Sequence, residues 1–307
     1  MTIAFTKMHG AGNDFVCLDG LSAPEVAGRE DLGALAEAMC DRRFGIGGDG
    51  LLVICAAQAG PDLPAGRSVR MRMFNVDGSE SSMCGNGLRC VAKYVIDHGL
   101  ARTGNDDVLH IQTDAGVIEA RCRRDSGETG EVASVTVDMG PPNLELETIP
   151  VDRAQLADGT GAGYTVEAGG VRYNAVFVSM GNPHAVIHVD DAERIDLAEI
   201  GPLLERHPAF PERINAHFVQ VISPGEVLMR TWERGSGITG ACGSGACAVC
   251  VAGVLAGVTG RSLNAHLPGG DLQLHWSESS GHVHMTGPAV EVFSGRWPVA
   301  SALQTTR

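Results

Sequence analysis

The sequence predicts an α/β (α+β) fold made of two similar halves, each a mostly β-stranded layer wrapped around one helix. One observation is that residues 227–258 read as a strand, a glycine-rich turn and an apolar helix. A second is that residues 69–99 repeat this order. A third is that both helices open on Cys-Gly-x-Gly, at Cys84 and Cys242, 158 positions apart. This spacing predicts an internal duplication with pseudo-two-fold symmetry.

The first half contains short strands and two helices. Apolar alternation between glycine turns predicts its strands over 3–8, 15–18, 51–55, 69–73, 108–113, 116–122 and 132–138. Helical periodicity predicts one helix over 31–43, and a second helix begins at Cys84. Gly99 follows His98 at the end of that second helix, where glycine is a common C-cap.

The second half repeats this composition. Its predicted strands cover 171–178, 185–189, 227–231, 272–276, 282–286 and 289–293. A short helix is predicted over 197–207, and a longer one over 242–258. The longer helix carries no charged residue, so it must be buried, and it is too short and too rich in glycine to span a bilayer. We expect it to be a core helix.

Composition and charge exclude several classes of function. The formal net charge is −14, and Lys7 and Lys93 are the only lysines, which argues against a nucleic acid or an anionic membrane as partner. The first ten residues show no secretory signal, so we expect a cytoplasmic protein. Nine scattered cysteines, an odd number, indicate a reduced protein without a disulfide framework.

Cofactor and metal motifs are weak in this chain. Gly235-x-Gly237-x-x-Gly240 matches a dinucleotide fingerprint, but the next acidic residue is Asp271, too far along for the ribose contact. Cys247-x-x-Cys250 lies inside the apolar helix, where cysteine packs as a small hydrophobe. We therefore expect neither a nucleotide cofactor nor a metal.

Cys84 and Cys242, which we call the entrance cysteines because each lies at the start of a predicted helix, indicate the chemistry. A helix N-terminus stabilises an anion and shifts a cysteine there toward the reactive thiolate. One such cysteine would more often be a buried thiol, but Cys84 and Cys242 occupy matching positions. Two opposed thiol groups suit removal of an α-proton from one face of an amino acid and its return on the other. The two helix N-termini would bind the α-carboxylate, and no pyridoxal phosphate would be needed.

In these motifs and in several others the chain resembles the diaminopimelate epimerase family over nearly its whole length. The matching stretches are KMHGAGNDFV (Lys7–Val16), FNVDGSE (Phe74–Glu80), CGNGLRC (Cys84–Cys90), MGNPH (Met180–His184), FPERINA (Phe210–Ala216), ERG (Glu233–Gly235), ACGSGA (Ala241–Ala246) and LPGG (Leu267–Gly270). The resemblance implies cofactor-independent conversion of LL- to meso-diaminopimelate. It also implies an N-terminal lobe over 1–128, a C-terminal lobe over 129–284, C-terminal strands over 285–307 that return to the first lobe, and an active site in the cleft.

The resemblance also assigns roles to individual residues. Cys84 and Cys242 are the two acid–base groups it implies, and His184 and Glu233 resemble the residues that tune them. The implied substrate contacts are Asn13, Asn75, Gly85, Asn86, Asn182, Asn215, Glu233, Arg234, Gly243 and Ser244. Two positions depart from the family's usual pattern, Gly50 in place of a glutamine and Ile238 within the usual Gly-Glu-Thr. Gly50 is therefore left out of the predicted site.

Two alternative functions stay open on the sequence alone. One is another cofactor-independent amino-acid racemase, similar to proline racemase, which would not need Arg234 together with three asparagines. The other is a thiol redox or metal-binding protein that uses Cys84, Cys242, Cys247 and Cys250. The lead interpretation predicts a small-molecule substrate, no cofactor, and a possible homodimer.

Overall fold

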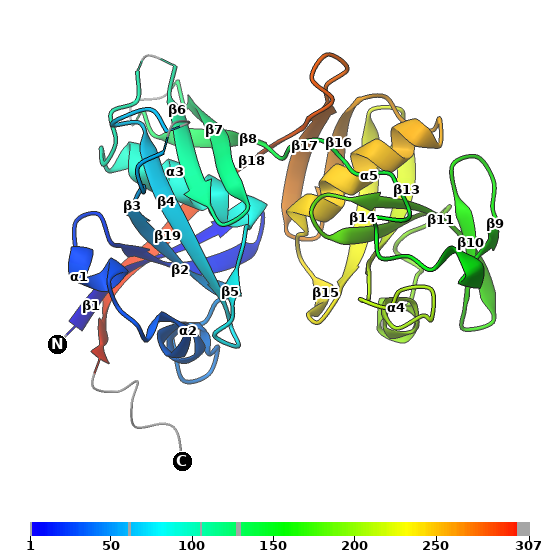
Figure 1. Cartoon of the computed structure of the whole chain (residues 1–307), viewed down its shortest axis with the longest axis horizontal. Coiled ribbons are helices and arrows are strands. Elements are labelled where there is room, and N and C mark those ends of the chain that lie inside the picture. The colour runs from blue at the N-terminus through cyan, green and yellow to red at the C-terminus, as the bar shows by residue number, and fades with distance from the viewer. Residues whose placement is uncertain (1, 61–62, 105, 127–129, 300–307) are drawn as a thin grey trace. The chain divides into compact units, whose positions relative to one another are not determined.

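The computed structural model describes residues 2–60, 63–104, 106–126 and 130–299, and these divide into two compact units (Figure 1). Unit 1 contains the described residues up to Val137 and from Gly287 onward, and unit 2 contains Asp138–Thr286. The predicted boundary between residues 128 and 129 lies outside the described residues, as do residues 300–307 of the predicted C-terminal return. The units change later than that boundary because the strand over Val132–Asp138 still pairs with its predecessor in unit 1.

Unit 1 consists of paired strands, a central helix and two further helices. Its elements are β1 (Thr2–Gly10), β2 (Asn13–Asp19), α1 (Pro24–Ala27), α2 (Leu32–Cys40), β3 (Gly50–Ala56), β4 (Ser68–Asn75), β5 (Glu80–Ser81), α3 (Gly85–Asp97), β6 (Val108–Thr113), β7 (Gly116–Arg124), β8 (Val132–Asp138) and β19 (Val290–Pro298). The strands pair in the order β19-β1-β2-β3-β4-β6-β7-β8, and β5 pairs with the end of β4. The pairs β2–β3 and β4–β6 are parallel, and the others are antiparallel. β19, which comes last in the described part of the chain, thus pairs with β1, which comes first.

Unit 2 has the same topology. Its elements are a short 3-10 helix (Arg153–Gln155), β9 (Ala157–Asp158), β10 (Tyr164–Ala168), β11 (Val171–Ser179), β12 (Pro183–His188), α4 (Leu197–Glu205), β13 (Asn215–Ser223), β14 (Glu226–Glu233), β15 (Gly237–Thr239), α5 (Gly243–Leu255), β16 (Ser262–Leu267), β17 (Gly270–Trp276) and β18 (Val283–Gly287). The strands pair in the order β9-β10-β11-β12-β13-β14-β16-β17-β18, and β15 pairs with the end of β14. Again two pairs are parallel, β12–β13 and β14–β16. The predicted fold, two similar halves each wrapped on a central helix, is confirmed.

Strand register makes the two units comparable residue by residue. Leu52 pairs with Met73 between β3 and β4, and His217 pairs with Thr231 between β13 and β14. Met73 then pairs with Ser81, as Thr231 pairs with Thr239. The stretch from β4 through α3 and the stretch from β14 through α5 therefore correspond without insertion or deletion.

The two central helices are buried and end in the same way. Nearly every residue of α3 and of α5 is buried, as expected for helices that the strands of their own units surround (Figure 1). Gly99 after α3 and Gly257 after α5 have φ values of 66° and 70°. Their N–H groups, and those of the residues that follow them, bond back to the last turn in the Schellman pattern. The predicted cap at Gly99 is confirmed, and Gly257 ends α5 before residue 258.

Most predicted strands and helices are present. The elements that the sequence did not predict are the longer strands β10, β13 and β16, the short elements α1, β5, β9 and β15, and the 3-10 helix. The sequences of β13 and β16, NAHFVQVIS and SLNAHL, place histidine and asparagine among apolar residues and so weaken the strand pattern. In β13, Asn215 and His217 are buried against partners that lie far away in the sequence, Pro183 and His184. None of the helices that the structure describes is both long enough and apolar enough to cross a membrane.

Candidate active site

The predicted site residues gather at the first turns of the two central helices. In unit 1 they form what we call half-site 1, comprising Asn13, Asn75, Cys84, Gly85 and Asn86. In unit 2 they form half-site 2, comprising Asn182, His184, Asn215, Glu233, Arg234, Cys242, Gly243 and Ser244. Each half-site combines a helix N-terminus with side chains from the ends of neighbouring strands.

Cys84 is the N-cap of α3. Its backbone is extended, with φ −146° and ψ 112°, and its Sγ accepts a hydrogen bond from the Gly87 N–H at 3.4 Å. The side chain is half-buried. A Cβ at Gly87 would lie 2.9 Å from Leu52 Cδ2, so glycine lets this turn pack tightly against β3. A sulfur that receives an N–H at a helix N-terminus is stabilised as thiolate.

A chain of side-chain amides lies beside Cys84 in half-site 1. Buried Arg89 donates through Nη2 to Asn86 Oδ1 at 2.8 Å, and Asn86 Nδ2 donates to Asn13 Oδ1 at 3.0 Å. Asn13 Nδ2 then donates to Asp49 Oδ2 at 2.6 Å. Asn75 ends β4, and its Nδ2 donates to Ser79 Oγ at 2.9 Å. The first two of these bonds orient the amides, with Asn86 Oδ1 toward Arg89 and Asn13 Oδ1 toward Asn86.

Cys242 occupies the matching position at the N-cap of α5, but it is more deeply buried than Cys84. Its side chain is 4% exposed, and its Sγ lies 3.9 Å from Ser244 Oγ. Burial raises the pKa of the Cys242 thiol well above its ordinary value, and the negative charge of Glu233 raises it further. Cys242 is therefore a thiol at rest near neutral pH.

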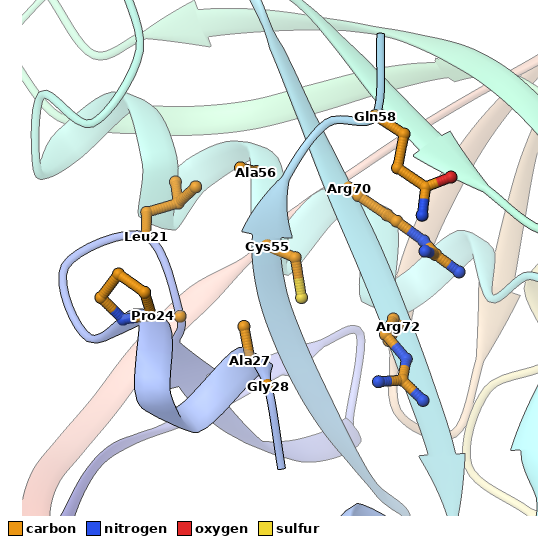
Figure 2. Close-up of a pocket in the computed structure, with 10 residues that line it drawn as sticks. Leu21, Pro24, Ala27, Gly28, Cys55, Ala56, Gln58, Arg70 and Arg72 are labelled. Carbon is orange, nitrogen blue, oxygen red and sulfur yellow. The ribbon is translucent and has the colours of Figure 1, made fainter. Parts of the chain in front are cut away.

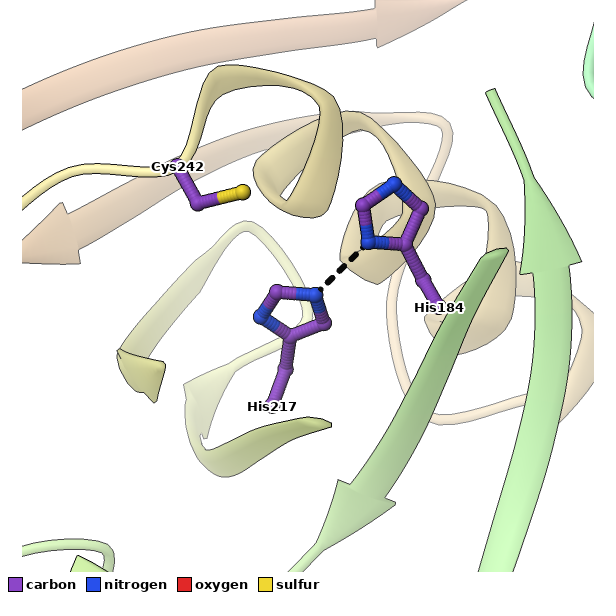
Figure 3. A group of neighbouring side chains, drawn as sticks. All are labelled: His184, His217 and Cys242. Atoms are coloured by element: carbon purple, nitrogen blue, oxygen red, sulfur yellow. Dashed lines mark hydrogen bonds between the residues drawn. The ribbon is translucent and has the colours of Figure 1, made fainter. Parts of the chain in front are cut away.

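The buried imidazole rings of His184 and His217 lie close to Cys242 (Figure 3). His184 Nδ1 and His217 Nε2 lie 2.9 Å apart and share a hydrogen bond. At the outer ends of this pair, His184 Nε2 is 2.9 Å from Asn182 Oδ1, and His217 Nδ1 is 3.0 Å from Thr231 Oγ1. Burial lowers the pKa of His217 to about 3. Burial, then the charges of His217 and Arg234, lower the pKa of His184 well below its ordinary value, so both rings are neutral near pH 7.

The remaining residues of half-site 2 are held by the ends of β13 and β14. Asn215 Oδ1 accepts from the Arg234 backbone N–H at 3.0 Å, and Asn215 Nδ2 donates to the Pro183 carbonyl at 2.9 Å. Thr239 donates to Glu233 Oε1 at 2.5 Å. The Arg234 side chain is exposed, with Nη1 donating to the Glu212 carbonyl. The buried asparagine thus fixes the backbone from which an exposed cation projects.

One group in the described part of the chain has the residue types of a metal site. Ligand atoms of His184, His217 and Cys242 all lie within 4.8 Å of one another. Zinc–nitrogen bonds of about 2.0–2.1 Å place two tetrahedral nitrogen ligands about 3.3 Å apart. The facing ring nitrogens are closer, at 2.9 Å, which is a hydrogen-bond distance. This geometry is that of a hydrogen-bonded imidazole pair.

A separate hollow of about 360 Å³ lies in unit 1 between α1 and the strands β3 and β4 (Figure 2). Arg70 and Arg72 on β4 line it, together with Cys55 at the end of β3. Arg70 pairs with Asp114 and Arg72 with Glu80, so both cations are already neutralised. The residues that line this hollow include none of the predicted site residues.

Sequence reasoning missed three residues that lie next to half-site 2. His217 and Thr231 complete the imidazole chain, and Gly245 makes room for it, because a Cβ there would lie 2.2 Å from His217 Cε1. The available signal was the period of two in β13, which puts His217 on the same face as Asn215. The structure also shows the surroundings of the two departures from the family pattern. A Cβ at Gly50 would lie 2.8 Å from the Phe74 carbonyl oxygen, and Ile238 is an exposed residue of β15.

The chain is also similar in sequence to known proteins. A family model described as diaminopimelate epimerase matches residues 5–145 and 176–292. A protein named diaminopimelate epimerase from Desulfovibrio desulfuricans is 48% identical over 300 residues, which cover 97% of this chain and 99% of the relative. A protein of the same name from Pelotomaculum thermopropionicum is 47% identical over 294 residues, with coverage of 96% and 98%.

Solved structures share the fold at much lower identity. A Bacillus anthracis phenazine biosynthesis protein of the PhzF family has a TM-score of 0.63 and 14% identity, with coverage of 97% of this chain and 100% of that one. A probable proline racemase from Agrobacterium radiobacter also has a TM-score of 0.63 and 14% identity, with coverage of 97% and 93%. At this identity the similarity establishes the α/β fold and carries no information on substrate.

Proposed function

The chain belongs to the diaminopimelate epimerase family, and we propose that it interconverts LL- and meso-diaminopimelate by moving the α-proton between two cysteines, without a cofactor. The observation that carries the proposal is the repeated placement of a cysteine as N-cap of a buried central helix, at Cys84 and at Cys242. Inversion at one carbon needs a base on one face and an acid on the other, and two cysteines at two helix N-termini provide them.

The two cysteines differ in their resting state, which assigns their roles. Cys242 is a thiol because burial and Glu233 raise its pKa. Cys84 accepts the Gly87 N–H at its helix N-terminus and is only half-buried, so a negative charge on its sulfur keeps more of its solvation. Cys84 therefore removes the α-proton from the LL substrate, and Cys242 delivers its own proton to the opposite face. After the turnover Cys84 is a thiol and Cys242 a thiolate, and proton exchange with solvent restores the starting state.

The negative charge that develops on the substrate needs donors fixed in advance. The α-carboxylate accepts backbone N–H groups at the two helix N-termini, from Gly85 and Asn86 in unit 1 and from Gly243 and Ser244 in unit 2. Because these donors are already oriented, they stabilise the enolate-like state without reorganising.

The second amino-acid centre of the substrate is zwitterionic and is bound by charged and amide side chains. Arg234 presents a cation to the distal carboxylate, and Glu233 presents a carboxylate to the distal ammonium group. Neutral amides complete these contacts, and they are Asn13, Asn75, Asn182 and Asn215. His184 and Glu233 also tune Cys242, since Glu233 raises the pKa of the thiol and His184 remains neutral.

The proposal extends to the cellular role. Diaminopimelate is a small-molecule substrate, and its epimerisation serves lysine and peptidoglycan precursor biosynthesis. We propose a cytoplasmic enzyme that needs no metal or other cofactor, and a homodimer as its assembly.

Stereoisomer analysis in deuterated water tests the reaction and its mechanism. Purified protein is incubated with LL-diaminopimelate and EDTA, and the isomers are separated at early conversion. We expect meso product with deuterium at the inverted carbon and almost none in the remaining LL substrate, because the delivered proton comes from solvent-exchanged Cys242. Equal early labelling of substrate and product would contradict the two-base scheme.

The same assay separates the two alternative functions. Racemisation of proline in place of diaminopimelate would support a proline-racemase-like enzyme. Loss of activity in EDTA, with metal bound to the purified protein, would support a metal-binding role. We expect diaminopimelate turnover at full rate in EDTA.

A further inference from the structure

We propose that His217 and Thr231 are positioning residues that fix the tautomer of His184 and, through it, the face that the Asn182 amide turns to the substrate. The hydrogen-bond chain is a feature of unit 2 by itself, whereas its effect on the substrate rests on the proposed function. None of the predicted roles includes His217 or Thr231.

The order of donors follows from elimination along the chain. Asn182 Oδ1 can only accept, so the His184 nitrogen that it faces, Nε2, carries the proton. A neutral imidazole holds one proton, so His184 Nδ1 is bare and accepts from His217 Nε2. His217 Nδ1 is then also bare, and it accepts from the Thr231 hydroxyl. Each of the four groups thus has one orientation.

The chain is closed to solvent, which makes this order strict. His184 and His217 are fully buried, and Thr231 is 3% exposed. Both rings stay neutral, because their burial lowers the pKa of each. The close approach of His217 to the first turn of α5 depends on the missing side chain at Gly245. A ring nitrogen that lost its partner in this environment would keep the desolvation cost of a buried polar atom.

Unit 1 shows that the fold itself does not require this polar chain. The residues at the register positions of His184, His217 and Thr231 are Phe15, Leu52 and Met73. All three are buried and apolar, and they pack behind the equivalent cysteine entrance. The polar set in unit 2 is therefore tied to what lies at its outer end, the partly exposed Asn182.

Asn182 is the end of this hydrogen-bond chain that would contact the substrate under the proposed function. An asparagine amide can offer a ligand either its oxygen or its two N–H donors, and a carboxylate can bind only the donors. With Oδ1 held by His184, the Asn182 Nδ2 group is the one left to meet a carboxylate oxygen. Asn13 in unit 1, at the register position of Asn182, likewise turns Oδ1 inward, where Asn86 holds it.

The tautomer itself can be measured without substrate. Nitrogen NMR of protein labelled with ¹⁵N-histidine should show His184 protonated at Nε2 and bare at Nδ1, and His217 likewise. Thr231→Val removes the hydroxyl donor and should give a mixture of tautomers at both rings, whereas Thr231→Ser should restore the single form. His184 protonated at Nδ1 in the unchanged protein, or ring signals that Thr231→Val leaves unaltered, would overturn the proposal.

Kinetics test the link from the tautomer to the substrate. We expect Thr231→Val and His217→Leu to raise KM for LL-diaminopimelate about tenfold, the effect of one misdirected hydrogen bond, with a smaller change in kcat. Leucine is chosen because Leu52 fills this position in unit 1. Thr231→Ser should recover the original KM, and His275→Leu, on the exposed face of β17, should leave KM unchanged.

The two measurements separate this inference from the proposed function. If the protein does not turn over diaminopimelate, the proposed function fails, and the NMR result alone decides whether Thr231 and His217 fix the tautomer of His184. If Thr231→Val scrambles the tautomer but KM stays constant, the link to Asn182 is wrong.

Discussion

The N-termini of α3 and α5 have the same backbone arrangement, but different side chains lie behind Cys84 and Cys242. In both units a strand ends, a short strand follows, and a cysteine caps a thirteen-residue central helix. Behind Cys84 lie Leu52 and Met73, whereas behind Cys242 lie His217 and Thr231. The repeated part supplies the helix N-terminus that both acid–base groups need. The variable part gives the two cysteines different surroundings, apolar next to Cys84 and hydrogen-bonded next to Cys242.

The largest expected effect comes from removing either cysteine. Cys84→Ala and Cys242→Ala should each lower kcat for epimerisation by about 10²–10⁴-fold or more, the usual contribution of one general acid or base. Each change leaves one face of the substrate without a proton carrier. The measurement is the rate of meso formation from LL-diaminopimelate, with Cys90→Ala in α3 as the control for a buried cysteine outside the two half-sites. Appreciable inversion by either entrance variant would contradict equal need for both.

The two entrance glycines should differ in tolerance to a methyl group. In Gly245→Ala the new Cβ would lie 2.2 Å from the His217 ring and 3.0 Å from Cys242 Sγ. In Gly87→Ala it would meet the flexible end of Leu52 at 2.9 Å. We expect Gly245→Ala to lower the free energy of unfolding by about 1–3 kcal/mol, as overpacked cores do, and to reduce activity more than Gly87→Ala. Urea denaturation with kcat measurements on both variants would show whether the order is reversed.

Alkylation rates should differ between Cys84 and Cys242. Cys84 is half-buried and accepts an N–H, while Cys242 is buried and has a raised pKa. The thiolate is the nucleophile, so iodoacetamide near pH 7.5 should label Cys84 before Cys242. Peptide mass mapping at early times measures the order, and saturating substrate should slow the labelling of Cys84. Faster modification of Cys242 would reverse the assigned roles.

The smallest expected effect concerns acid stability, at positions where the units differ again. Burial would raise the pKa of Asp14, but hydrogen bonds from Arg42 and Lys7 outweigh it and lower the pKa from 3.8 to about 2. A carboxylate with a lowered pKa stabilises the folded state above pH 3.8, and this contribution is lost as the pH falls from about 4 to about 2. Unit 2 has Pro183 at the register position of Asp14.

Asp14→Asn should therefore flatten the fall in stability over that acidic window. Thermal unfolding of both proteins between pH 2 and pH 6 provides the measurement. Asp41→Asn provides a comparison, because backbone N–H groups of Phe44 and Arg43 lower the pKa of the Asp41 carboxyl, whereas the side chains of Arg42 and Lys7 lower that of Asp14. An identical pH dependence in Asp14→Asn and the unchanged protein would show that the ion cluster contributes nothing to acid stability.

Much of the candidate site was readable from the sequence because its signals are local. A cysteine before Gly-x-Gly, at the start of an apolar helix and after a strand, needs only neighbouring residues to be recognised. The same holds for the cap at Gly99 and for the spacing between Cys84 and Cys242. The strands that were missed, such as β13 and β16, carry polar side chains whose partners lie far along the chain.

By itself, then, the sequence determined two repeated strand–turn–helix segments and the two cysteines at their helix entrances, since propensity, capping and helix dipoles act over a few residues. Only the tertiary structure decided what lies behind each cysteine. His217 meets His184 across a parallel strand pair and Thr231 across an antiparallel one, and neither contact follows from local spacing. Burial then sets the protonation of these groups, because the free energy of a charge depends on the solvent that the whole fold excludes.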